Sequence, residues 1–216
     1  MKKKDIVTRF VRFFKDRNYT RKGDMFYCIK NEFACCVMFQ SSGDMLYCNY
    51  FVFPLFIDSD TLHLSYGNRL ENFTYNQINP LLMTQGEDSC VGWVQAVTRC
   101  LEQYILPFFD SVSSLESMAS FLEKDDEFVK RYFFCPPDMY YKLKAYIYLV
   151  LKKTDLCELN IQRARYWIEK EPYTPLIKEQ KQEELRKLTL LLQDTEHCNL
   201  TLSRIIIHNK SKFFNL

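Results

Sequence analysis

The chain has 216 residues, with 29 Lys and Arg against 27 Asp and Glu, and a formal net charge of +2. This near-balance lacks the basic surplus of a nucleic-acid-binding domain, and a composition that is 47% hydrophobic excludes wholesale disorder. Aromatic residues make up 16% of the chain and glycines number only five, so the glycine-rich loops that hold nucleotide phosphates are scarce.

The first predicted element is a helix over residues 4–16. Apolar residues recur there at helical spacing, at Ile6, Val7, Phe10, Val11 and Phe14. Turn-forming residues over 18–24 then interrupt the pattern. We therefore expect a short amphipathic helix followed by a turn.

From Met25 to Tyr66 the hydrophobic period changes to two, which is typical of β-strands. We predict about four antiparallel strands, over residues 25–30, 33–40, 46–53 and 61–66. The Asn31-Glu32 pair and the segment 41–44 supply the turns of two hairpins. Because both faces of these strands are largely apolar, helices are expected to cover one of them.

Residues 67–86 are mostly polar and predict a long loop, which in a compact domain is more often functional than accidental. From Glu87 onward the pattern is helical, with Ser111 and Asp155 as predicted N-caps. The predicted helices cover residues 87–106 (ended by Pro107), 111–123, 125–134, 138–152, 155–170, 175–195 and about 197–208. Residues 138–170 resemble one tetratricopeptide-type hairpin, but no second copy follows, so a packed pair of ordinary helices is the preferred interpretation.

These elements together predict an α+β protein. It has an N-terminal helix, an antiparallel meander of about four strands and an all-helical C-terminal half packed against them. We expect an α+β domain over residues 1–134 and a helical C-terminal extension over residues 135–216, packed with the first domain as one unit.

The cysteines indicate the compartment. Nine occur, at positions 28, 35, 36, 48, 90, 100, 135, 157 and 198. They form no C-x-x-C motif and only three histidines accompany them, so no metal site is predicted. The start of the chain lacks the apolar core of a signal peptide, and no apolar run approaches the ~20 residues that cross a bilayer. We expect a cytoplasmic protein with reduced thiols, no membrane contact and no nucleic-acid partner.

Residues 10–70 contain a distinctive series of motifs: Phe14, then Tyr19-x-Arg21-Lys22-Gly23-x-x-Phe26-Tyr27, then Val37-x-Phe39-Gln40-Ser41, then Asn49. The series resembles the start of an uncharacterised bacterial family, domain of unknown function forty-three-zero-four. The resemblance covers roughly the first third of the chain and implies an intracellular bacterial α+β protein without an assigned activity. The helical region from about residue 130 onward has no counterpart in it.

Four polar residues stand out among the aromatic strands and just after them: Gln40, Asn49, His63 and Arg69. If the strand faces coincide, the first three form a polar patch that ends at Arg69 and suits a small anionic or amide-bearing ligand. In the alternative interpretation, Gln40 and Asn49 bond backbone groups at strand ends, and Arg69 pairs with Glu71 or a helix carboxylate.

No catalytic signature is found, so no catalytic residue and no cofactor are predicted. A cysteine activated by His63 is the remaining enzymatic alternative, but no cysteine lies in a glycine-flanked turn of the nucleophile-elbow type. Because aromatic residues anchor interfaces, the preferred hypothesis is a non-enzymatic protein-interaction module, toxin-neutralising or defence-associated. The alternative is a small-molecule-binding domain that uses the aromatic sheet face and the 67–86 loop. A broad exposed apolar patch favours the former, and a pocket of ~300 Å³ or more favours the latter.

Overall fold

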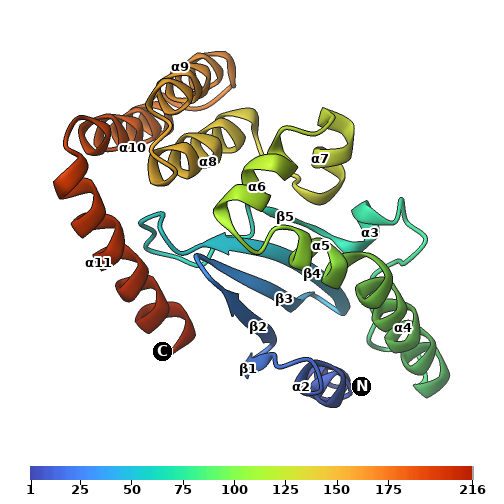
Figure 1. Cartoon of the computed structure of the whole chain (residues 1–216). Coiled ribbons are helices and arrows are strands. Elements are labelled where there is room, and N and C mark those ends of the chain that lie inside the picture. The colour runs from blue at the N-terminus through green and yellow to red at the C-terminus, as the bar shows by residue number, and fades with distance from the viewer. Residues whose placement is uncertain (216) are drawn as a thin grey trace. The chain divides into compact units, whose positions relative to one another are not determined.

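Residues 1–215 are described by a computed structural model, apart from the side chains of residues 195–197, and their fold is α+β (Figure 1). The chain divides into two compact units. Unit 1 comprises residues 1–54, 62–114 and 125–134, and unit 2 comprises residues 55–61, 115–124 and 135–216. One junction lies at 134–135, where the sequence predicted a domain boundary, but residues 55–61 and 115–124 group with the C-terminal helices.

The sheet of unit 1 confirms the predicted antiparallel meander. Its strands are β1 (Thr20–Lys22), β2 (Met25–Lys30), β3 (Phe33–Ser42), β4 (Met45–Pro54), β5 (Gly67–Arg69) and β6 (Leu81–Leu82). Within the described residues they lie in the order β1-β2-β3-β4-β5, and β6 pairs with another part of β4. The short strands β5 and β6 therefore share one edge of β4.

Two-residue turns connect the central strands, as local sequence predicted. Asn31-Glu32 joins β2 to β3, and Gly43-Asp44 joins β3 to β4, so the second turn is shorter than the predicted 41–44. Asn31 has φ +51° and Gly43 has φ +55°, in the left-handed region that Asn and Gly tolerate best.

The strand predicted at 61–66 is wrong, and its place in the sheet is taken by β5. After Pro54 the chain leaves the sheet, and the carbonyls of Leu55 and Ile57 accept hydrogen bonds from Asn209. The chain returns at Tyr66, whose carbonyl accepts from Val52 N at 2.8 Å. Residues 61–66 form no strand, although their side chains alternate in the sequence.

The helices of unit 1 differ from the prediction at their ends. They are α1 (Lys3–Thr8), α2 (Val11–Lys15), α3 (Leu70–Phe73), α4 (Glu87–Cys100), a π-helical segment (Leu101–Ile105), α5 (Leu106–Ser111) and α7 (Asp126–Tyr132). The predicted helix 4–16 is broken at Arg9 and Phe10. Pro107 does not end a helix, because the helical backbone continues from α4 through the π-helical segment into α5, and Pro107 lies within this run. Ser111 ends α5 instead of capping a helix, and Asp125 is the N-cap of α7.

Aromatic rings fill the core between the sheet and these helices. Phe26 stacks on Phe14 with ring centroids 4.3 Å apart, and Phe39 lies 4.5 Å from Phe10. On the same sheet face, Tyr50 contacts Phe73, Phe108 and Phe109 edge-on. This face therefore has the predicted helical cover (Figure 1).

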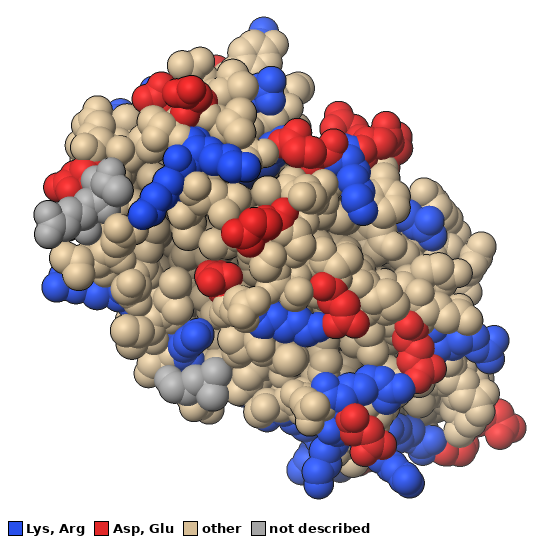
Figure 2. Space-filling view, viewed as in Figure 1, with Lys and Arg blue, Asp and Glu red and all other residues tan. Residues whose placement is uncertain are grey.

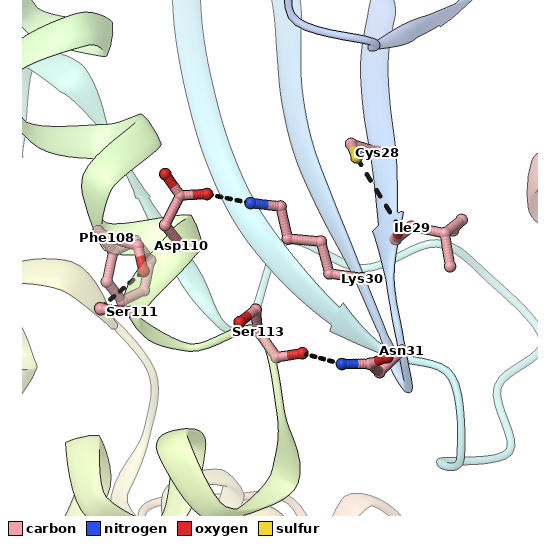
Figure 3. Close-up of polar contacts among 8 residues, drawn as sticks. All are labelled: Cys28, Ile29, Lys30, Asn31, Phe108, Asp110, Ser111 and Ser113. Carbon is pink, nitrogen blue, oxygen red and sulfur yellow. Dashed lines mark hydrogen bonds and ion pairs between the residues drawn. The ribbon is translucent and has the colours of Figure 1, made fainter.

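Polar contacts fasten the end of the β2–β3 hairpin to the region of α5 (Figure 3). Lys30 forms an ion pair with Asp110, and Asn31 Nδ2 donates to the Ser113 carbonyl at 2.9 Å. Ser111 Oγ donates to the Phe108 carbonyl at 2.8 Å and so closes the end of α5. These contacts hold the hairpin turn in one position.

The regular elements of unit 2 are all helices, within the described residues, and they confirm the predicted helical C-terminal half. Its helices are α6 (Leu115–Leu122), α8 (Pro137–Val150), α9 (Thr154–Lys170), α10 (Pro175–Gln193) and α11 (Thr195–Phe214). Asp155 lies inside the first turn of α9 and does not cap it. A buried cluster joins α8 to α10 and the segment before it: Asp138 accepts from Tyr173 Oη at 2.7 Å and from Lys181 Nζ at 2.5 Å.

The surface mixes both signs of charge. On the face shown in Figure 2, Lys and Arg lie close to Asp and Glu, and no broad region of one sign is visible. No helix in the described part of the chain has both the length and the apolar character needed to cross a membrane.

Candidate functional site

A hollow of about 430 Å³ lies in unit 1 beside the β4–β5 pair. Its lining consists of Asn49, Leu64, Gly67, Asn68, Arg69, Asn72 and Phe134. Asn49 comes from β4, residues 67–69 from β5 and Asn72 from α3, whereas Leu64 precedes β5 and Phe134 follows α7. We name it the Arg69 hollow.

The sheet register explains why Asn49 and Arg69 meet there. They are directly opposite partners on antiparallel strands, so their side chains project from the same face. Gln40 pairs with Tyr47, two residues before Asn49, and therefore shares that face. Asn49 is only 2% exposed, whereas Gln40 is exposed and does not line the hollow.

His63 lies elsewhere, in the irregular segment before β5. Its ring centroid is 5.3 Å from that of Phe53 and 5.7 Å from that of Tyr66. Phe53 projects from the Asn49 face, but four residues further along β4, and His63 does not line the hollow. Because residues 61–66 form no strand, the alternation expected for His63 does not apply. Of the four candidate residues, the structure thus brings Asn49 and Arg69 into one hollow.

Close approach of backbones builds this corner of the sheet. A Cβ atom on Gly67 would lie 1.9 Å from the Tyr50 carbonyl oxygen, so only glycine fits at this position. On its other side, the Gly67 carbonyl accepts from Phe134 N at 2.9 Å. Gly67 therefore sets β5 tightly between β4 and the end of α7.

Arg69 contributes the positive charge of the hollow. Its guanidinium lies over the Tyr47 ring, 4.7 Å from the centroid, and its side chain is 48% exposed. Arg69 Nη1 is 3.8 Å from Glu71 Oε1, which is an ion pair but too long for a hydrogen bond. Burial raises the pKa of Glu71, and the nearby Arg69 lowers it in part. The alternative pairing considered from sequence is therefore present, in a loose form.

The three asparagines play different parts. Asn68 is held by three hydrogen bonds: its Oδ1 accepts from Arg69 N and from Asn72 Nδ2, and its Nδ2 donates to the Arg131 carbonyl. Asn49 Nδ2 donates to the Met38 carbonyl over a long 3.4 Å, and each amide group of Asn49 and Asn72 keeps a second N–H. Donors from Asn49, Asn72 and Arg69 thus remain for a ligand.

Large aromatic side chains are exposed on unit 1, and one of them, Phe134, borders the hollow. They are Tyr75, Tyr104, Phe128 and Phe134, and we name them the aromatic surface. Tyr75 and Phe134 are each 74% exposed. Beneath them, Phe73 lies 5.7 Å from Tyr104 and 5.1 Å from Tyr132, and Tyr132 lies 5.4 Å from Phe128.

Arg131 on α7 connects the aromatic surface to the hollow. Its guanidinium carbon lies 4.5 Å from the Phe73 ring centroid and 5.6 Å from that of Tyr75. Its carbonyl accepts from Asn68 of the hollow and from Tyr50 Oη. The sequence pattern did not predict this surface. The signal that could have indicated it is an aromatic residue in polar surroundings, such as Tyr75 between Thr74 and Asn76.

The thiols have the wrong properties for nucleophilic chemistry. Burial raises the pKa of Cys28, Cys90 and Cys198, and that of Cys100 to about 11. A nucleophilic cysteine needs the opposite shift, because the thiolate is the reactive form. Among the side chains that the structure describes, no three His, Cys, Asp or Glu gather as a metal site.

Comparisons with models of protein families, with curated proteins and with solved structures found no match. The resemblance of residues 10–70 to the bacterial family stays a prediction. The Arg69 hollow and the aromatic surface are therefore the features from which a function can be inferred.

Proposed function

We propose that the chain is a protein-interaction module that binds its partner through the aromatic surface of unit 1. The observation that carries this proposal is that three exposed rings, those of Tyr75, Tyr104 and Phe128, are linked through Phe73, Tyr132 and Arg131, with exposed Phe134 two residues after Tyr132. Single exposed apolar residues are normal, but rings joined through shared neighbours form a patch. Tyr, Phe and Arg are also the residue types enriched in interface cores.

The finer form of the proposal is a cytoplasmic, toxin-neutralising or defence-associated role. All nine cysteines lie among the described residues and are free, which supports a reducing compartment. The role itself rests on analogy with small bacterial α+β proteins that lack catalytic motifs.

Two serine substitutions test the surface. Tyr75→Ser and Phe134→Ser are compared with Tyr166→Ser, which removes a 56%-exposed ring from α9 in unit 2. The tagged proteins are used for affinity capture from the source cytosol, with quantitative mass spectrometry. One protein should be recovered about thirtyfold less with either site variant and normally with the control, because a hot-spot truncation costs about 2 kcal/mol. If every captured protein is retained by both site variants, the proposal is wrong.

A small-molecule-binding function is the second candidate, and the volume of the Arg69 hollow favours it. About 430 Å³ lies within the ~300–1,000 Å³ typical of ligand pockets. Metabolite analysis of the purified protein tests it. A compound that is retained by the wild type and lost in Arg69→Ala, without any captured protein, would establish this function instead.

A further inference from the structure

We propose that the Arg69 hollow is a carboxylate subsite that receives an Asp or Glu side chain of the protein partner, and that Glu71 competes for Arg69 when the hollow is empty. This inference rests on the proposed function, because the partner supplies the carboxylate. It adds a chemical specificity that the aromatic surface alone does not have.

The charge of the lining is the first argument. Arg69 is the charged member of the lining, and the other six residues are neutral. A single negative charge therefore matches the hollow, whereas a phosphate dianion would bring more charge than one guanidinium balances. An uncharged side chain would leave the guanidinium without a counter-ion from the partner.

The donor geometry is the second argument. Arginine presents its N–H groups as a planar fork that matches the two oxygens of a carboxylate. The guanidinium carbon of Arg69 lies over the Tyr47 ring, 4.7 Å from its centroid, and such a contact uses no N–H donor in a hydrogen bond. Asn49 lies directly opposite on β4 and Asn72 lies at the rim, each with an N–H to spare.

Glu71 is the third argument. It approaches Arg69 to 3.8 Å and so supplies charge but no hydrogen bond. Its side chain is only 11% exposed, so most of it is shielded from solvent. An incoming carboxylate can take the hydrogen bonds that Glu71 does not make, and it must overcome the repulsion of Glu71. Neutralising Glu71 should therefore strengthen binding.

The position of the hollow selects a protein carboxylate over a free acid. Phe134 belongs both to the lining of the hollow and to the aromatic surface. Arg131 also links the two, because its carbonyl accepts a hydrogen bond from Asn68 and its guanidinium carbon lies 5.6 Å from the Tyr75 ring centroid. A partner whose apolar side chains cover Tyr75 and Phe134 can place an acidic side chain in the hollow within the same interface.

The experiment titrates the full-length protein with N-acetylglutamate amide and with N-acetylglutamine amide, monitored by amide chemical shifts in NMR spectra. The two probes differ in charge at the same shape. We expect capped glutamate to bind in the millimolar range, with shifts at residues 49, 67–72 and 134, and capped glutamine to bind at least tenfold more weakly.

Four variants separate the roles of the residues. Arg69→Gln should reduce the affinity for capped glutamate at least tenfold, because it removes the positive charge. Arg69→Lys should cause a smaller reduction, because lysine keeps the charge and loses only the bidentate contact. Glu71→Gln should raise the affinity about threefold, because it removes the repulsion between Glu71 and the incoming carboxylate. Arg12→Gln is the matched control, because Arg12 is exposed and also lies 3.8 Å from a carboxylate, that of Asp16, but does not line the Arg69 hollow.

The titration with capped glutamate can fail independently of the affinity capture that tests the aromatic surface. Equal binding of the two probes, or no binding of capped glutamate, overturns the inference. Binding of succinate but not of capped glutamate also overturns it, because the occupant would then be a free acid. If Tyr75→Ser and Phe134→Ser lose a captured protein that Arg69→Gln retains, the proposed function stands and the carboxylate subsite falls.

Discussion

Glu71 shows how one buried charge links stability to the candidate site. Its side chain is largely removed from water, and burial raises its pKa above the ordinary value of 4.5 despite the nearby Arg69. A carboxyl whose pKa is higher in the folded than in the unfolded protein binds protons more readily when folded. The folded state is therefore favoured below the unfolded pKa, and this contribution is lost as the pH rises through the folded pKa.

Glu71→Gln should accordingly raise the melting temperature at pH 7, because it removes the cost of a buried charge. The difference in melting temperature from the wild type should shrink on acidification. It should vanish below about pH 4, where Glu71 of the wild type is protonated in both the folded and the unfolded state. Thermal melts between pH 4 and pH 8 measure it, with the exposed Glu179→Gln as a control. A lower melting temperature of Glu71→Gln at pH 7 would mean that the Arg69 ion pair outweighs the cost of burial.

The strand β5 depends on a single glycine. Its backbone approaches β4 so closely at Gly67 that a methyl group would collide with the Tyr50 carbonyl. A backbone atom cannot move aside as a flexible side chain can, so the strand pair would have to separate. Because Arg69 is paired with Asn49 by this strand, the hollow depends on the same contact.

Gly67→Ala should reduce the free energy of unfolding by about 3 kcal/mol, which lowers the melting temperature by roughly 6–12 °C in a chain of this length. Gly92→Ala is the matched control with the opposite sign. Gly92 lies exposed within α4 with open space around it, so alanine should stabilise the helix by about 0.5–1 kcal/mol. Equal melting temperatures for Gly67→Ala and the wild type would contradict the close approach of β5.

The nine cysteines are spread over both units, and most are buried. Cys28 and Cys135 are the half-buried ones, and burial raises the pKa of Cys135 to about 12. The thiolate is the nucleophile, so Cys135 should react slowly although part of its surface is accessible. Cys28, on β2 beside the Lys30–Asp110 ion pair, is the thiol best placed to react first (Figure 3).

A thiol reagent should therefore label one cysteine quickly in the native protein and all nine in denaturant. Differential alkylation with peptide mass spectrometry should identify the rapidly labelled cysteine as Cys28. The substitution Cys28→Ser should then remove the fast phase of labelling. Fewer than nine thiols in denaturant under reducing conditions, or stoichiometric zinc by elemental analysis, would contradict the expectation of reduced, metal-free cysteines.

Local features were predictable because they depend on neighbours in the chain. The two hairpins follow from alternating side chains around Asn31-Glu32 and Gly43-Asp44, and the later helices follow from amphipathic spacing. The α+β class follows from the order of these elements. Helix ends were less predictable, as the break at Phe10 and the position of Pro107 show.

Part of the candidate site could also be anticipated. Strand alternation already places Asn49 and Gln40 on defined faces, and the register confirms that they share one. Alternation does not predict the position of His63, because residues 61–66 form no strand. Nor does strand alternation predict that Phe134 lines the hollow, since Phe134 lies 65 residues after Arg69 in the chain.

The amino-acid pattern was sufficient for the sheet-then-helix order, the hairpin turns and the scarcity of catalytic motifs, because these depend on spacing within a few residues. The pairing of Arg69 with Asn49, the place of β5 and the exposure of Tyr75 and Phe134 depend on contacts between distant segments. Burial and register are properties of the packed chain: an aromatic residue reads the same in the sequence whether its ring is covered or faces water. For that reason the hollow and the aromatic surface emerge once the strands and helices of unit 1 are folded together.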